Sequence, residues 1–174
     1  MVVDNRYTRQ ALRVNLAGER GACAIYKGQI ASLKNSHLRS VVEHMYKQEQ
    51  NHAEIFTKLA RQREVRPTVF SGLWDGLGYG LGKITALMGD DAAMICTLAV
   101  EDVIDGHYQE QINRLQESEP HLTQVLCTCQ AEEVEHFQKA NEVLQSLPVK
   151  PWHNPLANAI RWGTRCAIAL SKAL

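Results

Sequence analysis

The chain has 174 residues, of which 45% are hydrophobic, so it is long enough for one globular domain with a substantial core. Its 19 basic and 19 acidic residues cancel, which argues against nucleic acid as a partner. The five cysteines form no CxxC motif, and we expect them to be reduced thiols.

Capping and helix-breaking residues divide the chain into six predicted helices. Asn35 and Ser36 are N-cap residues, Pro67 ends the second helix, and Gly89 separates the third from the fourth. Pro120 opens the fifth helix. No stretch of useful length alternates between apolar and polar residues as a strand would. The predicted helices span about 5–33, 37–62, 69–88, 91–117, 119–147 and 154–173.

Two similar patterns of glutamate and histidine occur in the two halves of the chain. A lone glutamate precedes a Glu-x-x-His by 30 residues in the first half and by 32 in the second. Residues three apart share a helix face, so each Glu-x-x-His can present a carboxylate and an imidazole to one ion. Two lone glutamates with two Glu-x-x-His motifs are the ligand set of di-metal four-helix bundles. The candidate ligands are Glu19, Glu49 and His52 from the first half and Glu101, Glu133 and His136 from the second.

The residues that follow the two lone glutamates also match. Tyrosine, glutamine and isoleucine recur at equal offsets from Glu19 and from Glu101. We interpret the match as a duplicated helical hairpin, which would supply two equivalent half-sites for two metals. The single predicted domain, 1–174, would then contain pseudo-repeats at about 5–62 and 91–147.

All six candidate ligands fall within apolar stripes whose members are three and four residues apart. A stripe of this kind faces the core of a helical bundle. A carboxylate buried there is unfavourable unless it is paired or binds a metal. Two neutral imidazoles cannot balance four glutamates, whereas two divalent cations would. A buried polar cluster without metal is the weaker alternative.

The chemistry of the candidate ligands narrows the choice of metal. Carboxylates and imidazoles without a thiolate suit iron or manganese and argue against structural zinc. Two ferrous ions in such a site are suited to the activation of dioxygen. The predicted fold is therefore all-α, a ferritin-like di-iron four-helix bundle with two additional helices that face a membrane in part.

The predicted third helix, 69–88, is too apolar for an ordinary solvated helix. No strand precedes its glycines, so they do not indicate a dinucleotide-binding loop, and they are better explained by a close approach of two backbones. Asp75 and Lys83 disfavour a membrane span but allow the helix to lie in the interface. Core packing or an oligomer interface is the alternative. A cluster of arginines precedes the helix, namely Arg61, Arg63 and Arg66.

Several short segments are more specific than the metal ligands alone. They are Arg13-Val-Asn-Leu-Ala-Gly-Glu19, Gln48-Glu-Gln-Asn-His52, Val65-Arg-Pro-Thr68, Ala99-Val-Glu101 with His107-Tyr108, and Ala131-Glu-Glu-Val-Glu-His136. Together they resemble the demethoxyubiquinone hydroxylase family, the di-iron monooxygenases of ubiquinone biosynthesis. The similarity runs from about Arg9 to the end of the chain.

The resemblance implies an enzyme that uses O2 to hydroxylate the ring of demethoxyubiquinone or demethoxyubiquinol, with electrons from NADH. It implies two irons at the six candidate ligands, with Glu49 and Glu133 as bridges. It also favours a catalytic role near the irons for His107 and Tyr108. A ferritin-like oxidase or peroxidase, or a metal-storage or sensor bundle, is the competing interpretation, against which the apolar third helix argues.

Four further residues carry expectations of their own. Glu132 and Glu135 fall outside the apolar stripe and are expected in solvent. Leu16 and Arg20 depart from the family pattern, and we expect them to affect substrate or partner handling rather than metal binding.

The implied substrate is a membrane quinone, so the expected location is the surface of a membrane. This would be the cytoplasmic face of a bacterial inner membrane, or the matrix face of the mitochondrial inner membrane for a processed eukaryotic chain. Further candidate partners are a lipid-binding accessory protein of ubiquinone biosynthesis and a second copy of the chain.

Overall fold

The computed structural model describes residues 5–173, which form six helices and no strand within that range. The predicted helices are confirmed to within a few residues at each end. Residues 1–4 and 174 of the predicted domain lie outside the described range. The helices are α1 (Asn5–Ile30), α2 (Ser36–Gln62), α3 (Ser71–Met88), α4 (Asp90–Leu115), α5 (Pro120–Gln145) and α6 (His153–Ala173).

Helix ends follow the capping residues that the sequence predicted. The side chain of Asn35 accepts hydrogen bonds from the backbone N–H groups of His37 and Leu38, at 3.1 and 3.2 Å, as an N-cap residue does. Gly89 joins α3 to α4 with a φ of 132°, a conformation that favours glycine. Pro120 occupies the start of α5, where its missing N–H leaves no hydrogen bond unmade.

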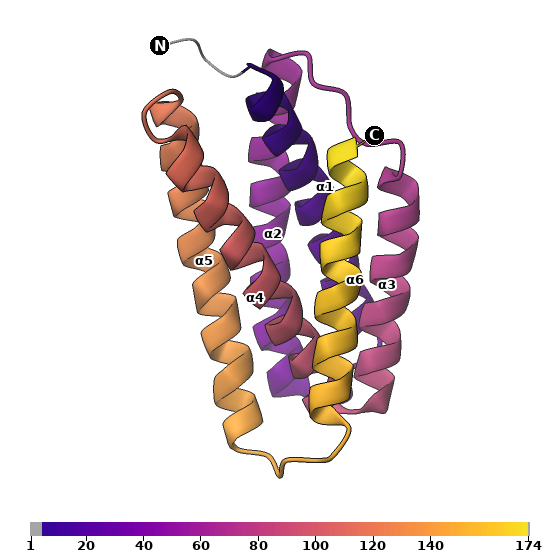
Figure 1. Ribbon diagram of the computed structural model, residues 1–174. Coiled ribbons are helices and arrows are strands. Elements are labelled where there is room, and N and C mark those ends of the chain that lie inside the picture. Colours follow the sequence, from indigo (N-terminus) through magenta and orange to yellow (C-terminus); the bar gives the residue numbers. More distant parts are fainter. Residues whose placement is uncertain (1–4, 174) are drawn as a thin grey trace.

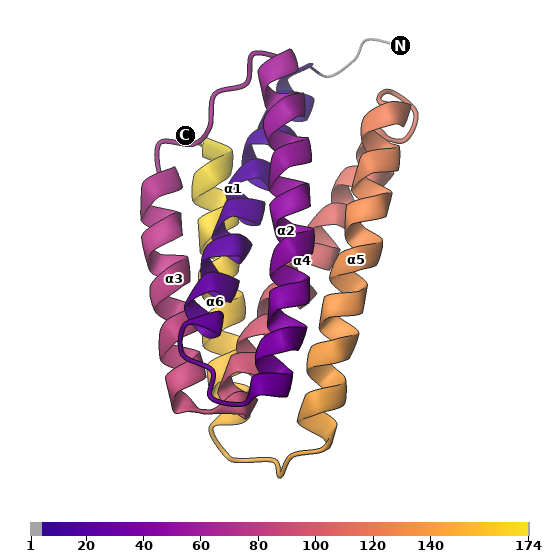
Figure 2. The same cartoon turned by 180° about the vertical axis from the view of Figure 1, so that it is seen from behind.

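Two helical hairpins, α1–α2 and α4–α5, form the bundle, and α3 and α6 lie together on one side of it (Figure 1). The reverse view shows α5 on the side away from α3 and α6 (Figure 2). The connection from α2 to α3 crosses one end of the bundle, and that from α5 to α6 crosses the other. The two hairpins are the segments in which the chain pattern is repeated, although their origin by duplication stays a prediction.

Glycines bring α3 close to α1, as predicted for the apolar third helix. A Cβ atom on Gly78 would lie 2.8 Å from the carbonyl oxygen of Gly21, and one on Gly82 would overlap the backbone of Ile25. Gly76 and Gly80 have open space instead. The α1–α3 contact is therefore a backbone-to-backbone one that larger residues at Gly78 and Gly82 would push apart.

The outer face of α3 and of the loop before it is apolar and exposed. No helix among residues 5–173 is long and apolar enough to cross a membrane. Of the arginines that precede α3, Arg63 forms an ion pair with Glu119 at 2.6 Å. The partly membrane-facing position of α3 stays a prediction. The exposed apolar side chains of this face are Val69, Leu73, Leu77, Tyr79, Ile84, Leu87 and Met88.

Candidate metal centre

All six predicted ligands meet at the centre of the bundle, and each is less than 5% exposed. They form two overlapping groups whose candidate ligand atoms lie within 4.8 Å of one another. We call them the His52 half-site and the His136 half-site, and the carboxylates of Glu49 and Glu133 belong to both. The His52 half-site consists of Glu19, Glu49, His52 and Glu133, and the His136 half-site of Glu49, Glu101, Glu133 and His136.

The Nδ1 atom of each histidine faces the carboxylates. Nδ1 of His52 lies 3.2 Å from Oε1 of Glu133, 3.4 Å from Oε2 of Glu19 and 3.8 Å from Oε2 of Glu49. The arrangement repeats in the His136 half-site, where Nδ1 of His136 lies 3.2 Å from both Oε1 of Glu49 and Oε2 of Glu133. The two shared carboxylates thus point one oxygen toward each histidine.

Two buried tyrosines each bind one of the unshared glutamates. Tyr26 donates a hydrogen bond of 2.6 Å to Oε1 of Glu101, and Tyr108 donates one to Oε1 of Glu19. Burial, followed by the charge of the neighbouring glutamate, raises the pKa of each phenol well above its ordinary value. Both hydroxyls therefore stay protonated and act as donors that hold Glu19 and Glu101 in place.

The carboxylates of the centre influence one another's pKa values because they are buried side by side. Burial, with the charge of Glu133, raises the pKa of Glu49 well above its usual value and that of Glu101 to about 7. Burial alone would lower the pKa of His136, but the surrounding carboxylates raise it to about 12. The centre therefore strongly favours positive charge, whether it is carried by protons or by metal ions.

The polar atoms at the centre fit metal ligands. Both oxygens of Glu49, Oε2 of Glu133, and Nδ1 of His52 and of His136 are buried without a hydrogen-bond partner. Buried polar atoms are rarely left in this state. The unpaired atoms are the ones that converge, and their carboxylate and imidazole chemistry suits iron or manganese. The residues present therefore fit two bound cations.

The outer nitrogen of each histidine is bonded to a residue of the opposite Glu-x-x-His helix. Nε2 of His52 lies 3.0 Å from Oε2 of Glu132, and Nε2 of His136 lies 3.1 Å from Oε1 of Gln48. The expectation that Glu132 is solvated holds only in part, because its side chain is 31% exposed and its carboxylate reaches from α5 to His52 of α2. Glu135 is exposed as expected. Each Nε2 carries the proton, which leaves Nδ1 free to bind a cation.

His107 lies outside both half-sites but is held by a buried hydrogen-bond network. The amide nitrogen of Gln111 lies 2.7 Å from Nε2 of His107 and 2.7 Å from Oδ1 of Asn15. Because Nε2 accepts this hydrogen bond, the proton of the neutral imidazole is on Nδ1. Burial, assisted by the charge of Lys172, lowers the pKa of His107 to about 4.

The lowered pKa of His107 predicts a loss of stability in acid. The pKa falls from 6.5 to about 4 on folding, so between these pH values the unfolded chain binds a proton that the folded chain does not. Stability therefore falls as the pH drops through this window. A His107→Asn variant has no imidazole at this position, so it does not lose stability in this way. Relative to the variant, the free energy of unfolding of the wild type should fall by up to about 3 kcal/mol between pH 7 and pH 4.

Urea denaturation of both metal-free proteins across this pH range measures the difference. If the free energies of unfolding of the two proteins changed with pH in the same way, His107 would bind its proton as well in the folded chain as in the unfolded one, which would contradict the prediction.

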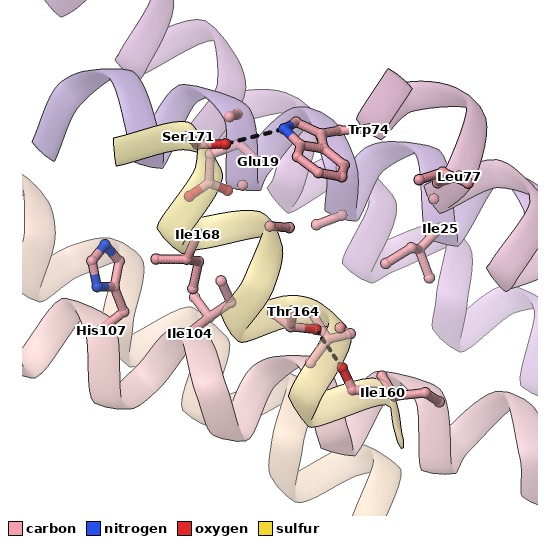
Figure 3. Close-up of a pocket in the computed structure, with 18 of the residues that line it drawn as sticks. Glu19, Ile25, Trp74, Leu77, Ile104, His107, Ile160, Thr164, Ile168 and Ser171 are labelled. Atoms are coloured by element: carbon pink, nitrogen blue, oxygen red, sulfur yellow. Dashed lines mark hydrogen bonds between the residues drawn. The ribbon is translucent and has the colours of Figure 1, made fainter. Parts of the chain in front are cut away.

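An apolar cavity of about 490 Å³ reaches the metal centre from the side of α3 and α6 (Figure 3). Buried Glu19 and Tyr108 line its inner part, while Leu77, 56% exposed, also lines it at the surface. Trp74 donates a hydrogen bond of 3.0 Å to Ser171 across the cavity, from α3 to α6. Its apolar walls include Val14, Ala17, Ile25, Leu81, Val100, Ile104, Ile160 and Ile168.

The structure places the other singled-out residues around this cavity. His107 lines it, on the opposite side of α6 from Trp74 in the view of Figure 3. Arg20 forms an ion pair with Asp75 of α3, beside the cavity. Leu16 is 5% exposed and belongs to the apolar core. The two departures from the family pattern thus have different settings: Leu16 packs in the core, and Arg20 pairs with a residue of α3.

An antiparallel helical bundle with two carboxylate–imidazole half-sites at its centre is a ferritin-like bundle of the di-metal carboxylate class. Comparison with known families narrows this class. A model of the family described as ubiquinone biosynthesis protein COQ7 matches residues 6–171. The chain belongs to this family.

Individual relatives agree along most of the chain. The 3-demethoxyubiquinol 3-hydroxylase of Rhodospirillum rubrum is 43% identical over 164 residues, which cover 92% of this chain and 76% of the relative. The human protein named NADPH-dependent 3-demethoxyubiquinone 3-hydroxylase, mitochondrial, is 40% identical over 167 residues, covering 94% and 76%. Its namesake from Caenorhabditis elegans is 35% identical over 176 residues, covering 96% and 93%.

Proposed function

We propose that this protein is a di-iron monooxygenase that hydroxylates the ring of demethoxyubiquinone or demethoxyubiquinol in ubiquinone biosynthesis, with O2 as co-substrate. Family membership and the names of the relatives support this activity over that of an oxidase, a peroxidase, or a metal-storage or sensor bundle. The six residues of the two half-sites would hold the irons. When bound, two ferrous ions supply the electrons with which O2 is activated.

The observation that carries the proposal is the apolar cavity that ends at the metal centre. A quinol ring that enters beside Leu77 can reach Glu19 and Tyr108 without leaving apolar surroundings. Such walls exclude bulk water from the reaction. His107 lines the same cavity as a neutral imidazole and can exchange a proton with a substrate hydroxyl. A storage bundle has no need of this cavity.

The test is hydroxylation by the iron-loaded protein of a demethoxyubiquinone with a short tail, under ¹⁸O2. One labelled hydroxyl oxygen per product molecule is expected by mass spectrometry. Oxygen consumption without a hydroxylated ring would instead identify an oxidase or peroxidase and contradict the proposal.

We propose NADH as the source of the electrons, as the family resemblance implied. Several eukaryotic relatives are named NADPH-dependent, so the two dinucleotides must be compared directly. Equal concentrations of each should give faster hydroxylation with NADH. Faster hydroxylation with NADPH would assign the other dinucleotide.

We further propose that the protein is peripheral to a membrane and binds it through α3. The exposed apolar face of α3 and its loop borders the cavity at Leu77, so a quinone could pass from the bilayer into the cavity. The face would lie on the cytoplasmic surface of a bacterial inner membrane or the matrix surface of the mitochondrial one. We also propose a lipid-binding accessory protein and a second copy of the chain as candidate partners.

His107 and Tyr108 should act on turnover in different ways. His107 contacts no candidate ligand, so His107→Ala should lower the hydroxylation rate by about 10²-fold or more and leave iron content unchanged. Tyr108→Phe removes the hydrogen bond to Glu19, so it should also weaken metal binding, by about 10-fold or more.

The matched control for Tyr108→Phe is Tyr26→Phe, which removes the corresponding hydrogen bond to Glu101. Tyr26 does not line the cavity, so this variant should weaken metal binding with a smaller effect on the rate at full occupancy. Equal rates in both tyrosine variants, measured at full iron occupancy, would contradict a catalytic role for Tyr108. Loss of iron in His107→Ala would make His107 part of the metal site.

A further inference from the structure

The candidate metal centre is nearly symmetric in the residues that face its interior. Each half-site has one histidine, one unshared glutamate and the two shared glutamates. The unshared glutamates have equivalent partners, because Tyr108 binds Glu19 and Tyr26 binds Glu101. No charged group of this inner set distinguishes a first cation site from a second, although the buried thiol of Cys129 hydrogen-bonds to His52.

The symmetry is broken at the outer edges of the two histidines. Nε2 of His52 is bonded to the carboxylate of Glu132 at 3.0 Å, whereas Nε2 of His136 is bonded to the neutral amide of Gln48 at 3.1 Å. The two partners occupy equivalent positions, since each directly precedes the glutamate of a Glu-x-x-His motif. The centre thus carries the same geometry twice, with a charged acceptor on one side and a neutral one on the other.

A carboxylate acceptor raises the basicity of a histidine ligand more than an amide acceptor does. Partners of this kind orient the ring and raise its basicity as a ligand, and their removal typically lowers metal affinity by about 10- to 100-fold. The charge of Glu132 also attracts a cation directly. It lies in a partly buried position, 31% exposed, where solvent screens it less than on an open surface.

We propose that Glu132 makes the His52 half-site the tighter of the two, so that this half-site takes up the first divalent cation and the His136 half-site the second. Glu132 acts as a positioning residue through His52 and is not itself a ligand. The inference rests on the proposed di-metal centre and concerns only the order and relative affinity of its two sites.

The test is an anaerobic titration of the metal-free full chain with Co²⁺, a stand-in for Fe²⁺ that resists oxidation by traces of O2. Binding is measured by calorimetry and by absorption. The wild type should bind two ions in steps whose affinities differ by about 10- to 100-fold. Glu132→Gln makes both outer partners amides, so the two steps should merge. Gln48→Glu makes both partners carboxylates, so the weaker step should tighten toward the stronger one.

Two ligand variants identify which half-site is filled in each step. Glu101→Ala removes a ligand found only in the His136 half-site, so the tighter step should survive. Glu19→Ala removes one found only in the His52 half-site, so the weaker step should survive. Loss of the tighter step in Glu101→Ala together with its survival in Glu19→Ala would overturn the proposal.

Glu135→Gln is the control for charge, since it makes the same change on the same helix at an exposed position. It should leave both steps unchanged, and an effect as large as that of Glu132→Gln would overturn the proposal. Two Co²⁺ binding steps of equal affinity in the wild type would also overturn this proposal, but they would leave the proposed function intact. If the wild type bound no Co²⁺ with a defined stoichiometry, the proposed metal centre itself would fail.

Discussion

Iron-loaded Glu49→Ala and Glu133→Ala proteins should each retain less than one ion per chain, where the wild type holds about two. Each of these carboxylates belongs to both half-sites, so its removal takes an oxygen ligand from both cations. Removing an outer partner of a ligand already lowers affinity by up to about 100-fold, and loss of a ligand shared by two ions should exceed that figure. Hydroxylation should fall by at least the same factor, measured together with iron content after anaerobic loading.

Glu19→Ala is the matched control, because it removes a carboxylate that belongs to one half-site only. It should retain about one ion per chain. Equal iron loss in all three variants would show that the two carboxylates are not shared in the way the geometry indicates. Full iron content in Glu49→Ala or Glu133→Ala, or one tightly bound zinc in the wild type, would contradict the di-iron assignment.

Loss of iron must be distinguished from loss of fold, and Glu49→Gln makes the distinction. Burial and the charge of Glu133 raise the pKa of Glu49 well above its usual value, so folding of the metal-free protein bears the cost of burying this carboxyl group or of protonating it. An amide of the same shape removes this cost, so Glu49→Gln should raise the free energy of unfolding of the metal-free protein by about 1–3 kcal/mol. The variant would then be more stable than the wild type without metal and unable to hold two ions. A decrease in stability would mean that Glu49 also supports the fold.

The six candidate ligands could be predicted because their signals are local. A Glu-x-x-His motif places two ligands on one face of a single helix, and the apolar stripe around it shows that this face is buried. The caps at Asn35, Gly89 and Pro120 likewise depend on neighbouring residues. Such features need no knowledge of how the helices pack.

The outer partners of the histidines could not be found in this way. Glu132 falls outside the apolar stripe of its own helix, and only the spacing and rotation of α2 against α5 bring it to His52. One signal was available, since Glu132 and Gln48 precede the two motifs at equivalent positions. The cavity was equally inaccessible, because four helices contribute to its walls. Ion pairs between helices, such as Arg20 with Asp75, belong to the same class of features.

Membrane binding should be lost when the exposed apolar side chains of α3 are replaced without altering the cavity. Trp74, Leu77 and Leu81 are unsuitable, because all three line it. Residues 73, 84 and 87 are leucine, isoleucine and leucine, 51, 59 and 64% exposed, and do not line the cavity.

Changing Leu73, Ile84 and Leu87 together to serine should weaken binding to vesicles of phosphatidylcholine and phosphatidylglycerol by at least about 100-fold. Full burial of one such side chain contributes about 1.5–3 kcal/mol, so partial insertion of three is sufficient. Co-sedimentation with the vesicles measures the change.

The matched control is Val149→Ser, at a side chain that is 87% exposed in the connection between α5 and α6. It should sediment with vesicles as the wild type does. Because the cavity is unaltered, the triple variant should still hydroxylate a quinone with a short tail while losing activity on a long-tailed quinone in vesicles, since only the second substrate must be taken from a bilayer. Equal sedimentation of wild type and triple variant would contradict a membrane-binding role for this face. A triple variant that differs from the wild type only in oligomeric state would identify the face as the contact between two copies of the chain.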